Sequence, residues 1–317
     1  MSSYTVIVSV LFLLLLGWLS RKAGWITLAQ KDGALKIVFS IFFPFLVFNL
    51  LASVQLKLDV ASMVILLLVL YGQFYYLGRT ILSRWLSPYS EIGAFLLTTA
   101  EGGNMALPLY LSIVGAKSAT AGYPILLDLA GMIFCFIIIP VLVCARQEKK
   151  VVPSRLVLDA LHSPMIIAAL LGLAANLTGF YDWMSTTAFM PWYSSAISMV
   201  TSPIVPVVLF SVGYDFQLTQ KITGPAVRCV LPRLVLFSGI IGLFFLFFPD
   251  RMHDPAFLMA ALLYFTAPTG FGVLGQIQPL MKTEDQKEYA SAVFTLNMAV
   301  TLMIFACCMI FYGSLGH

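Results

Sequence analysis

The sequence predicts an all-α polytopic membrane protein with ten transmembrane helices, arranged as two inverted five-helix repeats in which helices 4 and 9 are broken. Three observations lead to this prediction. Of the 317 residues, 60% are hydrophobic and only 10% are charged, with a mean hydropathy of +0.95, whereas a soluble domain carries about 25% charged residues. Ten apolar stretches are long enough to cross a bilayer, and landmarks of the first five recur in the last five.

The composition argues against several other classes of protein. The formal net charge is +4 and no block of Lys and Arg occurs, so nucleic acid is not an expected partner. The histidines, His162, His253 and His317, lie at span edges or at the terminus, and no catalytic motif is present, so we expect no enzyme activity and no cofactor beyond a coupling ion. The cysteines have no metal or disulfide spacing and are interpreted as packing residues; they are Cys135, Cys144, Cys229, Cys307 and Cys308.

Stretches of about 20 apolar residues define the expected spans. In chain order they cover residues 4–20, 35–53, 60–82, 92–114, 121–144, 163–180, 190–212, 227–248, 256–279 and 289–312. The first is not expected to be a cleaved signal peptide, because its basic residues, Arg21 and Lys22, follow the apolar stretch instead of preceding it. The expected organisation is a first repeat at 1–145, a cytoplasmic connector at 146–162 and a second repeat at 163–317.

The basic residues predict the orientation. Of the 18 Lys and Arg residues, 15 lie in or beside the odd-numbered connections, Arg233 among them, and three lie in the even-numbered ones: Lys57, Lys117 and Arg251. Because basic connections stay in the cytoplasm, both termini are expected outside a cell inner (plasma) membrane.

Three landmarks recur in the same order in both halves. Pro44–Asn49 corresponds to Pro206–Ser211 at an offset of 162, Leu96–Gly103 to Leu263–Gly270 at 167, and Leu127–Leu129 to Leu296–Met298 at 169. Five spans per copy is an odd number, so the second copy must enter the membrane from the opposite face. This predicts an inverted repeat with its binding site at the repeat interface near the midplane.

The fourth and ninth stretches contain Gly, Pro and Thr where a stable span would have Leu. We expect helix breaks there, marked by Pro108 and Pro268. Gly costs about 1 kcal/mol and Pro about 3 kcal/mol inside a helix, and freed backbone groups are tolerated at membrane depth only when protein or a water-filled cavity covers them. Paired breaks in two halves are typical of the binding site of a secondary transporter.

Two carboxyl groups within the spans are candidates for ion coupling. Glu101 would cost about 2.5–3.5 kcal/mol as a charge at the bilayer centre, and no Lys or Arg in the spans is expected to pair with it, so we predict a protonation or cation-coupling site. The alternative is a protonated, purely structural Glu101. Asp128 should lie roughly 10 Å inside the outer boundary; it is either a second member of a proton relay or an uncoupled residue in a wet vestibule.

The substrate contacts are expected where half-helices restart after the breaks. The free N–H groups and positive dipole ends that follow Gly102–Gly103 and Pro268–Gly270 suit an anion. The side chains expected around it are Thr99, Asn104, Thr269, Asn49 and Asn297. Thr99 can instead bond to its own helix, and Asn49 or Asn297 can instead bridge helices.

The segment Glu101–Leu109 resembles the fourth-helix motif of the auxin efflux carrier family, commonly Asn-Thr-Gly-Phe-Leu-Gly-Leu-Pro-Leu, with departures at Glu101, Asn104 and Ala106. That family includes plant PIN-formed carriers and bacterial malonate and malate permeases. The resemblance implies a ten-helix inverted-repeat fold, also used by sodium/bile-acid symporters, with crossing broken helices 4 and 9.

The expected function is secondary active transport of a small organic anion, a carboxylate, by alternating access. Helices one, two, six and seven would form a scaffold against which the rest moves, with proton coupling through Glu101. The alternatives are a sodium-coupled organic-anion symporter and, from another class, a membrane sensor or channel that does not transport. The lipid bilayer is an expected partner, and a homodimer is left open.

Overall fold

The computed structural model describes residues 3–54, 56, 59–100, 105–115, 118–147, 162–215 and 220–315. Within these ranges every regular element is a helix. Seven helical stretches in this part of the chain are long and apolar enough to cross a membrane, judged by length and composition. The fold is therefore that of an all-helical, multi-pass membrane protein.

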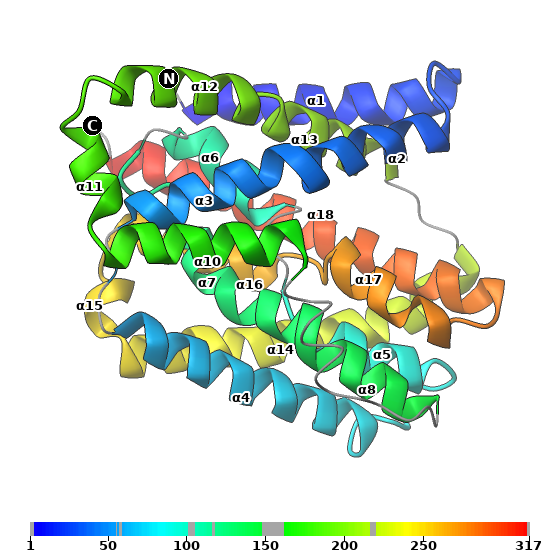
Figure 1. The fold of residues 1–317 in the computed structure, drawn as a ribbon. Coiled ribbons are helices and arrows are strands. Elements are labelled where there is room, and N and C mark those ends of the chain that lie inside the picture. Colours follow the sequence, from blue (N-terminus) through cyan, green and yellow to red (C-terminus); the bar gives the residue numbers. More distant parts are fainter. Residues whose placement is uncertain are drawn as a thin grey trace.

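One layer of the molecule, which we call the panel, lies at the top of Figure 1. It consists of α1 (Ser3–Ala23), α2 (Leu28–Ile37) continuing through a π-helical turn (Val38–Phe42) into α3 (Phe43–Ser53), α10 (Pro164–Leu177), α12 (Met190–Thr201) and α13 (Ile204–Asp215). Within the panel α1 packs along α13, and α3 packs along α10. These helices correspond to the first, second, sixth and seventh expected spans.

The remaining long helices form a second layer, which we call the core bundle. It consists of α4 (Asp59–Arg79), α5 (Ser90–Leu96), α6 (Ala106–Val114), α7 (Tyr123–Ile133) continuing through a π-helical turn (Phe134–Ile138) into α8 (Ile139–Arg146), α14 (Gln220–Phe247), α16 (Pro255–Thr266), α17 (Phe271–Ile277) and α18 (Glu284–Leu315). Short connecting elements are α11 (Phe180–Ser185), α15 (Pro249–Met252) and a 3-10 turn (Gln278–Leu280). The panel meets the bundle through α1 and α13 on α6, α1 on α18 and α3 on α7.

The two ends of the molecule are distinct. Both chain termini lie at one end, with α11 and α15, and we call this the termini end (left in Figure 1). The start of α2 and the end of α8 lie at the opposite end.

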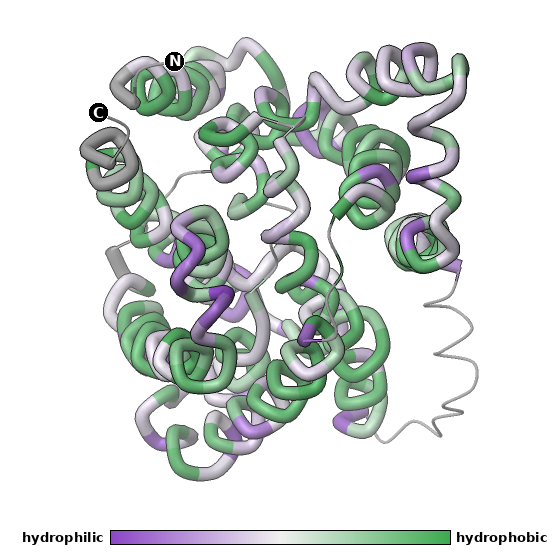
Figure 2. Tube along the Cα trace, turned by 90° about the vertical axis from the view of Figure 1, so that its left-hand side faces the viewer, coloured by the Kyte–Doolittle hydropathy of each residue, from purple (hydrophilic) through white to green (hydrophobic). Residues whose placement is uncertain are grey.

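The outer surface is apolar, as a bilayer-facing surface must be. Apolar residues dominate the helices in Figure 2. On α1, the side chains of Leu11, Phe12 and Leu15 are 53%, 61% and 52% exposed. A soluble protein rarely exposes a continuous apolar surface of this kind, whereas lipid chains would cover it.

The two π-helical turns have the same local cause. Each runs for five residues and is followed by one residue and then a proline, Pro44 after the first and Pro140 after the second. Proline has no backbone N–H and its ring collides with the preceding turn of a regular α-helix. A wider π turn accommodates the ring, so both long helices continue instead of ending.

Several helices begin before the expected apolar stretch. The expected start of the second span was residue 35, but α2 begins at Leu28 because a capping box stabilises its first turn. The Thr27 N–H donates to Oε1 of Gln30 at 2.8 Å, and the Gln30 N–H donates to Oγ1 of Thr27 at 3.3 Å. α14 and α18 likewise begin with polar turns, at Gln220 and Glu284. Hydropathy identifies only the membrane-embedded part of such a helix.

Small residues allow the panel helices to approach closely. A Cβ atom added to Gly17 of α1 would overlap the carbonyl oxygen of Phe210, and one added to Gly213 of α13 would overlap that of Leu14. Close backbone approach at small residues is how helices pack without a hydrophobic driving force in lipid. The α1–α13 contact therefore requires glycine on both sides.

The other panel contact combines a glycine with a polar side chain. A Cβ on Gly172 of α10 would lie 2.8 Å from the Phe48 carbonyl oxygen. One turn further on, Nδ2 of Asn176 donates to the carbonyls of Leu51, Ala52 and Val54 at 2.9, 3.1 and 2.6 Å. Asn176 thus satisfies carbonyl groups that the end of α3 leaves without helical partners.

We expect Gly17→Ala and Gly213→Ala each to lower the free energy of unfolding by about 1–3 kcal/mol, because the added methyl group overlaps backbone of the facing helix. The measurement is the thermal-unfolding midpoint of the purified protein in detergent. Gly239→Ala on α14 is the matched control, since a Cβ there meets nothing within 4 Å. Equal midpoints for all three variants would contradict the packing argument.

Candidate functional site

Two helices are interrupted inside the core bundle. The first interruption separates α5, which ends at Leu96, from α6, which begins at Ala106; the second separates α16, which ends at Thr266, from α17, which begins at Phe271. α16 packs against α6, and α17 packs against α5. Each half of one interrupted helix therefore packs against the opposite half of the other, and we call the place where they meet the crossing point.

The predicted residues of the interruptions are only partly described. Glu101, Gly102, Gly103 and Asn104 lie outside the described residues. In the second interruption, Pro268, Thr269 and Gly270 are all buried between α16 and α17.

Pro108 does not interrupt its helix, which corrects the expected break position. It is the third residue of α6 and is buried in the first helical turn. The N–H groups of a first turn have no intrahelical acceptor, so a proline there loses no hydrogen bond.

The position of Arg233 in the structure differs from the one predicted from the sequence. It was expected in a cytoplasmic connection, but it lies inside α14 and is only 1% exposed. Its Nη1 donates to the Leu96 carbonyl at 2.9 Å, and its Nη2 donates to the carbonyls of Thr99 at 2.8 Å and Ala267 at 2.9 Å. One guanidinium therefore binds the carbonyl ends of both interrupted helices, so the spans do contain a cation next to the breaks.

Other side chains also donate to carbonyls of the interruptions. Oγ1 of Thr269 donates to the Leu96 carbonyl at 2.8 Å, and the Tyr264 hydroxyl donates to that of Ala100 at 3.0 Å. Oγ1 of Thr301 on α18 donates to the Thr266 carbonyl at 2.7 Å. These side chains thus supply protein donors to freed carbonyls, as the bilayer interior requires.

The Arg233 side chain is held in place by aromatic rings. Its guanidinium carbon lies 4.3 Å from the ring centroid of Phe237, one turn further along α14. Phe237 in turn packs against Tyr71 of α4 and Phe265 of α16. A cation over an aromatic face is attracted by the ring quadrupole, so the charge is stabilised without reaching solvent.

Asp128 lies beside the first interruption. It is 1% exposed on α7, and its carboxyl group interacts with the Tyr264 hydroxyl, which is 3.4 Å from the Tyr71 hydroxyl. Gly131 makes room for this group, because a Cβ there would lie 2.7 Å from the Tyr264 hydroxyl and 2.9 Å from Oδ1 of Asp128. Asp128 is therefore buried among protein groups and not in a wet vestibule.

Thr99 and Asn297 each present a buried oxygen to the interior. Oγ1 of Thr99 and Oδ1 of Asn297 have no hydrogen-bond partner among the described residues. Asn297 uses its Nδ2 on the Val293 carbonyl of its own helix, at 3.1 Å. Buried polar atoms are usually hydrogen-bonded, so both oxygens are available to a ligand.

Asn49 lies apart from these groups, in a cavity of about 700 Å³ near the termini end. Its Oδ1 accepts from the Tyr193 hydroxyl at 3.1 Å, so it bridges α3 to α12. The cavity is lined by Leu46, Asn49, Ser53, Leu111, Ser112, Ser118, Ala119, Tyr181, Met190, Ser194, Ile197, Ser198, Thr201, Ser202 and Val205.

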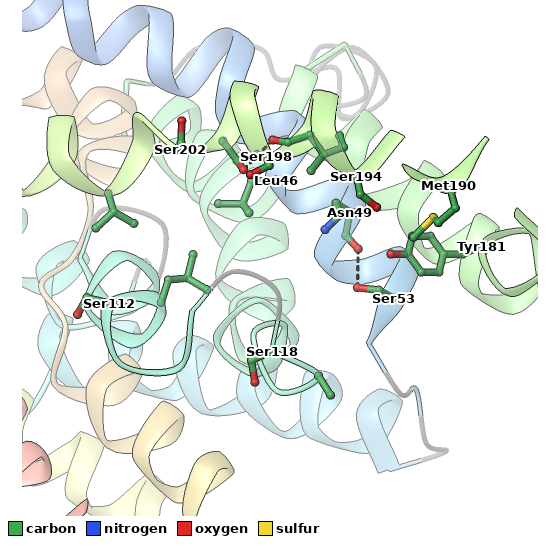
Figure 3. Close-up of a pocket in the computed structure, with 15 residues that line it drawn as sticks. Leu46, Asn49, Ser53, Ser112, Ser118, Tyr181, Met190, Ser194, Ser198 and Ser202 are labelled. Carbon is green, nitrogen blue, oxygen red and sulfur yellow. Dashed lines mark hydrogen bonds between the residues drawn. The ribbon is translucent and has the colours of Figure 1, made fainter. Parts of the chain in front are cut away.

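Hydroxyl groups dominate the polar lining of this cavity. α12 contributes Ser194 and Ser198 from one side, and Ser112 and Ser118 lie on the other (Figure 3). Burial raises the pKa of Tyr181, so its hydroxyl remains a neutral hydrogen-bond donor. None of the described lining residues is charged, which makes this a neutral space, partly lined by hydroxyl groups, between the panel and the core bundle.

A second cavity lies between the two layers at the opposite end and is charged. Its volume is about 330 Å³, and Arg21, Lys31, Asp215 and Lys287 are among its lining residues. Nζ of Lys31 contacts both carboxylate oxygens of Asp215, at 2.9 and 2.8 Å. The two cavities thus open between the same pair of layers but differ in electrostatic character.

The sequence reasoning missed Arg233, Tyr264 and Thr301. The sequence could have indicated a role for Arg233, because the residue falls six positions inside the apolar stretch 227–248, where a charge is costly unless a partner binds it. Tyr264 and Thr301 carried no such signal, since aromatic and hydroxyl residues are common in spans.

A family model described as membrane transport protein matches residues 2–309. The chain belongs to this family. It is the auxin efflux carrier family, as the resemblance of Glu101–Leu109 suggested, and its members are transporters rather than enzymes. A comparison with curated proteins gives no match. The chain is accordingly a multi-pass membrane transport protein.

We expect Thr269→Val to lower the free energy of unfolding by about 0.5–1.5 kcal/mol, because the valine cannot donate to the Leu96 carbonyl, which then keeps only its bond from Arg233. The thermal-unfolding midpoint in detergent is the measurement. Thr178→Val at the end of α10 is the control, since Thr178 is exposed and bonds only within its own helix. A loss no larger than that of the control would show that the Thr269 contact does not support the interruption.

Proposed function

We propose that this chain is a secondary active transporter that moves a small organic anion across the cell inner membrane by alternating access. The observation that carries the proposal is the meeting of two interrupted helices, whose carbonyl ends are bound by one buried arginine. Such paired interruptions are typical of transporter binding sites at the membrane midplane.

The proposal includes ten spans in two inverted repeats, at 1–145 and 163–317, joined by 146–162. Seven of the ten proposed spans are the long apolar helices described above. The other three are the short helix α10 and the two interrupted spans, α5–α6 and α16–α17. Reciprocal packing supports the repeat. α1 packs on α13 as α10 packs on α3, and α6 packs on α16 as α17 packs on α5, which a two-fold relation between the halves requires.

Alternating access follows from the two layers. The panel is the proposed scaffold, and the core bundle, which carries both interruptions, is the proposed moving part. The neutral cavity and the charged cavity lie between these layers at opposite ends. A sliding movement of packed helices past one another could open one cavity to the interruptions while closing the other.

The proposed substrate is a carboxylate. The N-terminus of α6 begins at the first interruption and presents free N–H groups to it. The Thr99 hydroxyl can donate to a carboxylate oxygen, and Oδ1 of Asn297 can accept from a hydroxyl or N–H group of the same molecule. Asn49 would contact substrate in the neutral cavity, before it reaches the interruptions.

The proposed coupling ion is a proton, exchanged at Glu101, with both termini outside and basic connections in the cytoplasm. Asp128 is the proposed second member of the relay, because it interacts with Tyr264 beside the same interruption. A sodium-coupled symporter, and a sensor or channel that does not transport, remain the alternatives.

The first test records currents on solid-supported membranes from proteoliposomes, using a panel of mono- and dicarboxylates with pH and sodium varied independently. We expect a saturable, pH-dependent current for one acid. Glu101→Gln should remove the pH dependence of the current, because an amide cannot exchange a proton. Glu284→Gln is the control and should retain the pH dependence, because Glu284 is exposed at the start of α18.

An unchanged pH profile in Glu101→Gln would exclude Glu101 as the coupling site. Conductance without saturation would support a channel. Silence for every acid, at every pH and with or without sodium, would overturn the organic-anion proposal.

The second test concerns Asp128. We expect Asp128→Asn to shift the pH profile of the same current, because it removes an ionisable group in contact with Tyr264 beside the interruption. Asp250→Asn on α15, an exposed residue that lines neither cavity, is the control. A profile that matches the unmodified protein would remove Asp128 from the relay and leave it a packing role.

A further inference from the structure

We propose that the guanidinium of Arg233 is a built-in cation of the crossing point, occupying the carbonyl-lined position that a monovalent metal ion would otherwise take. The transport cycle then requires no sodium at this position. The inference rests on the proposed function and deepens it, because it removes the crossing point as a sodium site in the sodium-coupled form.

The position suits a cation because two helices end there. Leu96 is the last residue of α5, and Ala267 is the C-cap residue of α16. The C-terminal ends of helices carry partial negative charge, and backbone carbonyls in a membrane interior are the groups that replace the hydration shell of a monovalent cation. A positive charge is needed where two such ends converge.

Arg233 supplies that charge with the right geometry. Its Nη2 bonds to Thr99 of the first interruption and Ala267 of the second, so a single nitrogen joins the two helices. Its Nη1 bonds to Leu96. A guanidinium is planar, remains charged in proteins and is less strongly hydrated than an ammonium group, so it can replace a dehydrated ion.

The group is confined to this position. Arg233 is 1% exposed, and its guanidinium lies over Phe237, which packs between Tyr71 and Phe265. Its three described hydrogen bonds all go to backbone carbonyls. An arginine enclosed in this way cannot exchange with ions from solution during a cycle, unlike a bound sodium ion.

The experiment measures the thermal-unfolding midpoint of the purified full-length protein while NaCl is replaced by choline chloride at constant ionic strength. We expect the midpoint of the unmodified protein to be independent of sodium. Arg233→Ala should lower it by about 5 °C or more, because three buried carbonyls lose their donor. Guanidinium chloride, well below denaturing concentrations, should restore part of that loss.

Arg228→Ala is the matched control, since Arg228 lies on the same helix but is exposed; we expect a small change in midpoint and no response to guanidinium. If Arg233→Ala does not accumulate, the inference is tested by the unfolding midpoint of Arg233→Lys and by the effect of sodium on the midpoint of the unmodified protein. The lysine variant should be intermediate, because one ammonium cannot reproduce the fork of donors.

A midpoint of the unmodified protein that rises with sodium would overturn the inference, as would Arg233→Ala or Arg233→Lys matching the unmodified protein. Currents measured in sodium and in choline provide the transport readout, and equal currents are expected. A folded protein that moves no acid would count against the proposed function alone, because the stability measurements test Arg233 without any substrate.

Discussion

The structure depends on the requirement that every backbone carbonyl freed inside a membrane must find a donor. Two interrupted helices free several such groups at one depth. Arg233 binds three of them, from both interruptions; Thr269 shares the Leu96 carbonyl with it, and Tyr264 and Thr301 bind the carbonyls of Ala100 and Thr266. Without these donors the interruptions would revert to continuous helix or unfold, and no polar site would exist at the centre of the bundle.

The two layers of the molecule differ in the contacts that hold them together and in their proposed roles. The panel is held by close backbone approach at Gly17 and Gly213, by the bonds of Asn176 to carbonyls at the end of α3, and by the Lys31–Asp215 ion pair. The core bundle adds side-chain hydrogen bonds to the backbone of its interruptions. Between the layers lie a neutral, hydroxyl-lined cavity at the termini end and a charged one at the opposite end. These cavities leave part of the boundary between the layers unpacked, and relative movement there disrupts fewer contacts.

The candidate site shows how far single residues could be predicted. Thr99 and Asn297 were predicted as ligand groups, and each has a buried oxygen with no partner among the described residues. Thr269 was predicted in the same role, yet its hydroxyl binds the Leu96 carbonyl. Asn49 lines the neutral cavity, away from the interruptions. Composition and spacing identify polar residues at membrane depth, but which of them bind backbone depends on neighbours distant in the chain.

The sequence by itself determined the membrane class, the family and the two segments in which the interruptions fall, because hydropathy, Gly and Pro act locally along the chain. Only the tertiary structure decided what satisfies those interruptions. Arg233 was assigned to a connection because basic residues usually mark loops, whereas its actual partners, Leu96 and Thr99, are more than 130 positions away. A hydrogen bond between such distant groups leaves no periodic trace in a single sequence, and it becomes visible only when the packed helices bring donor and carbonyl together.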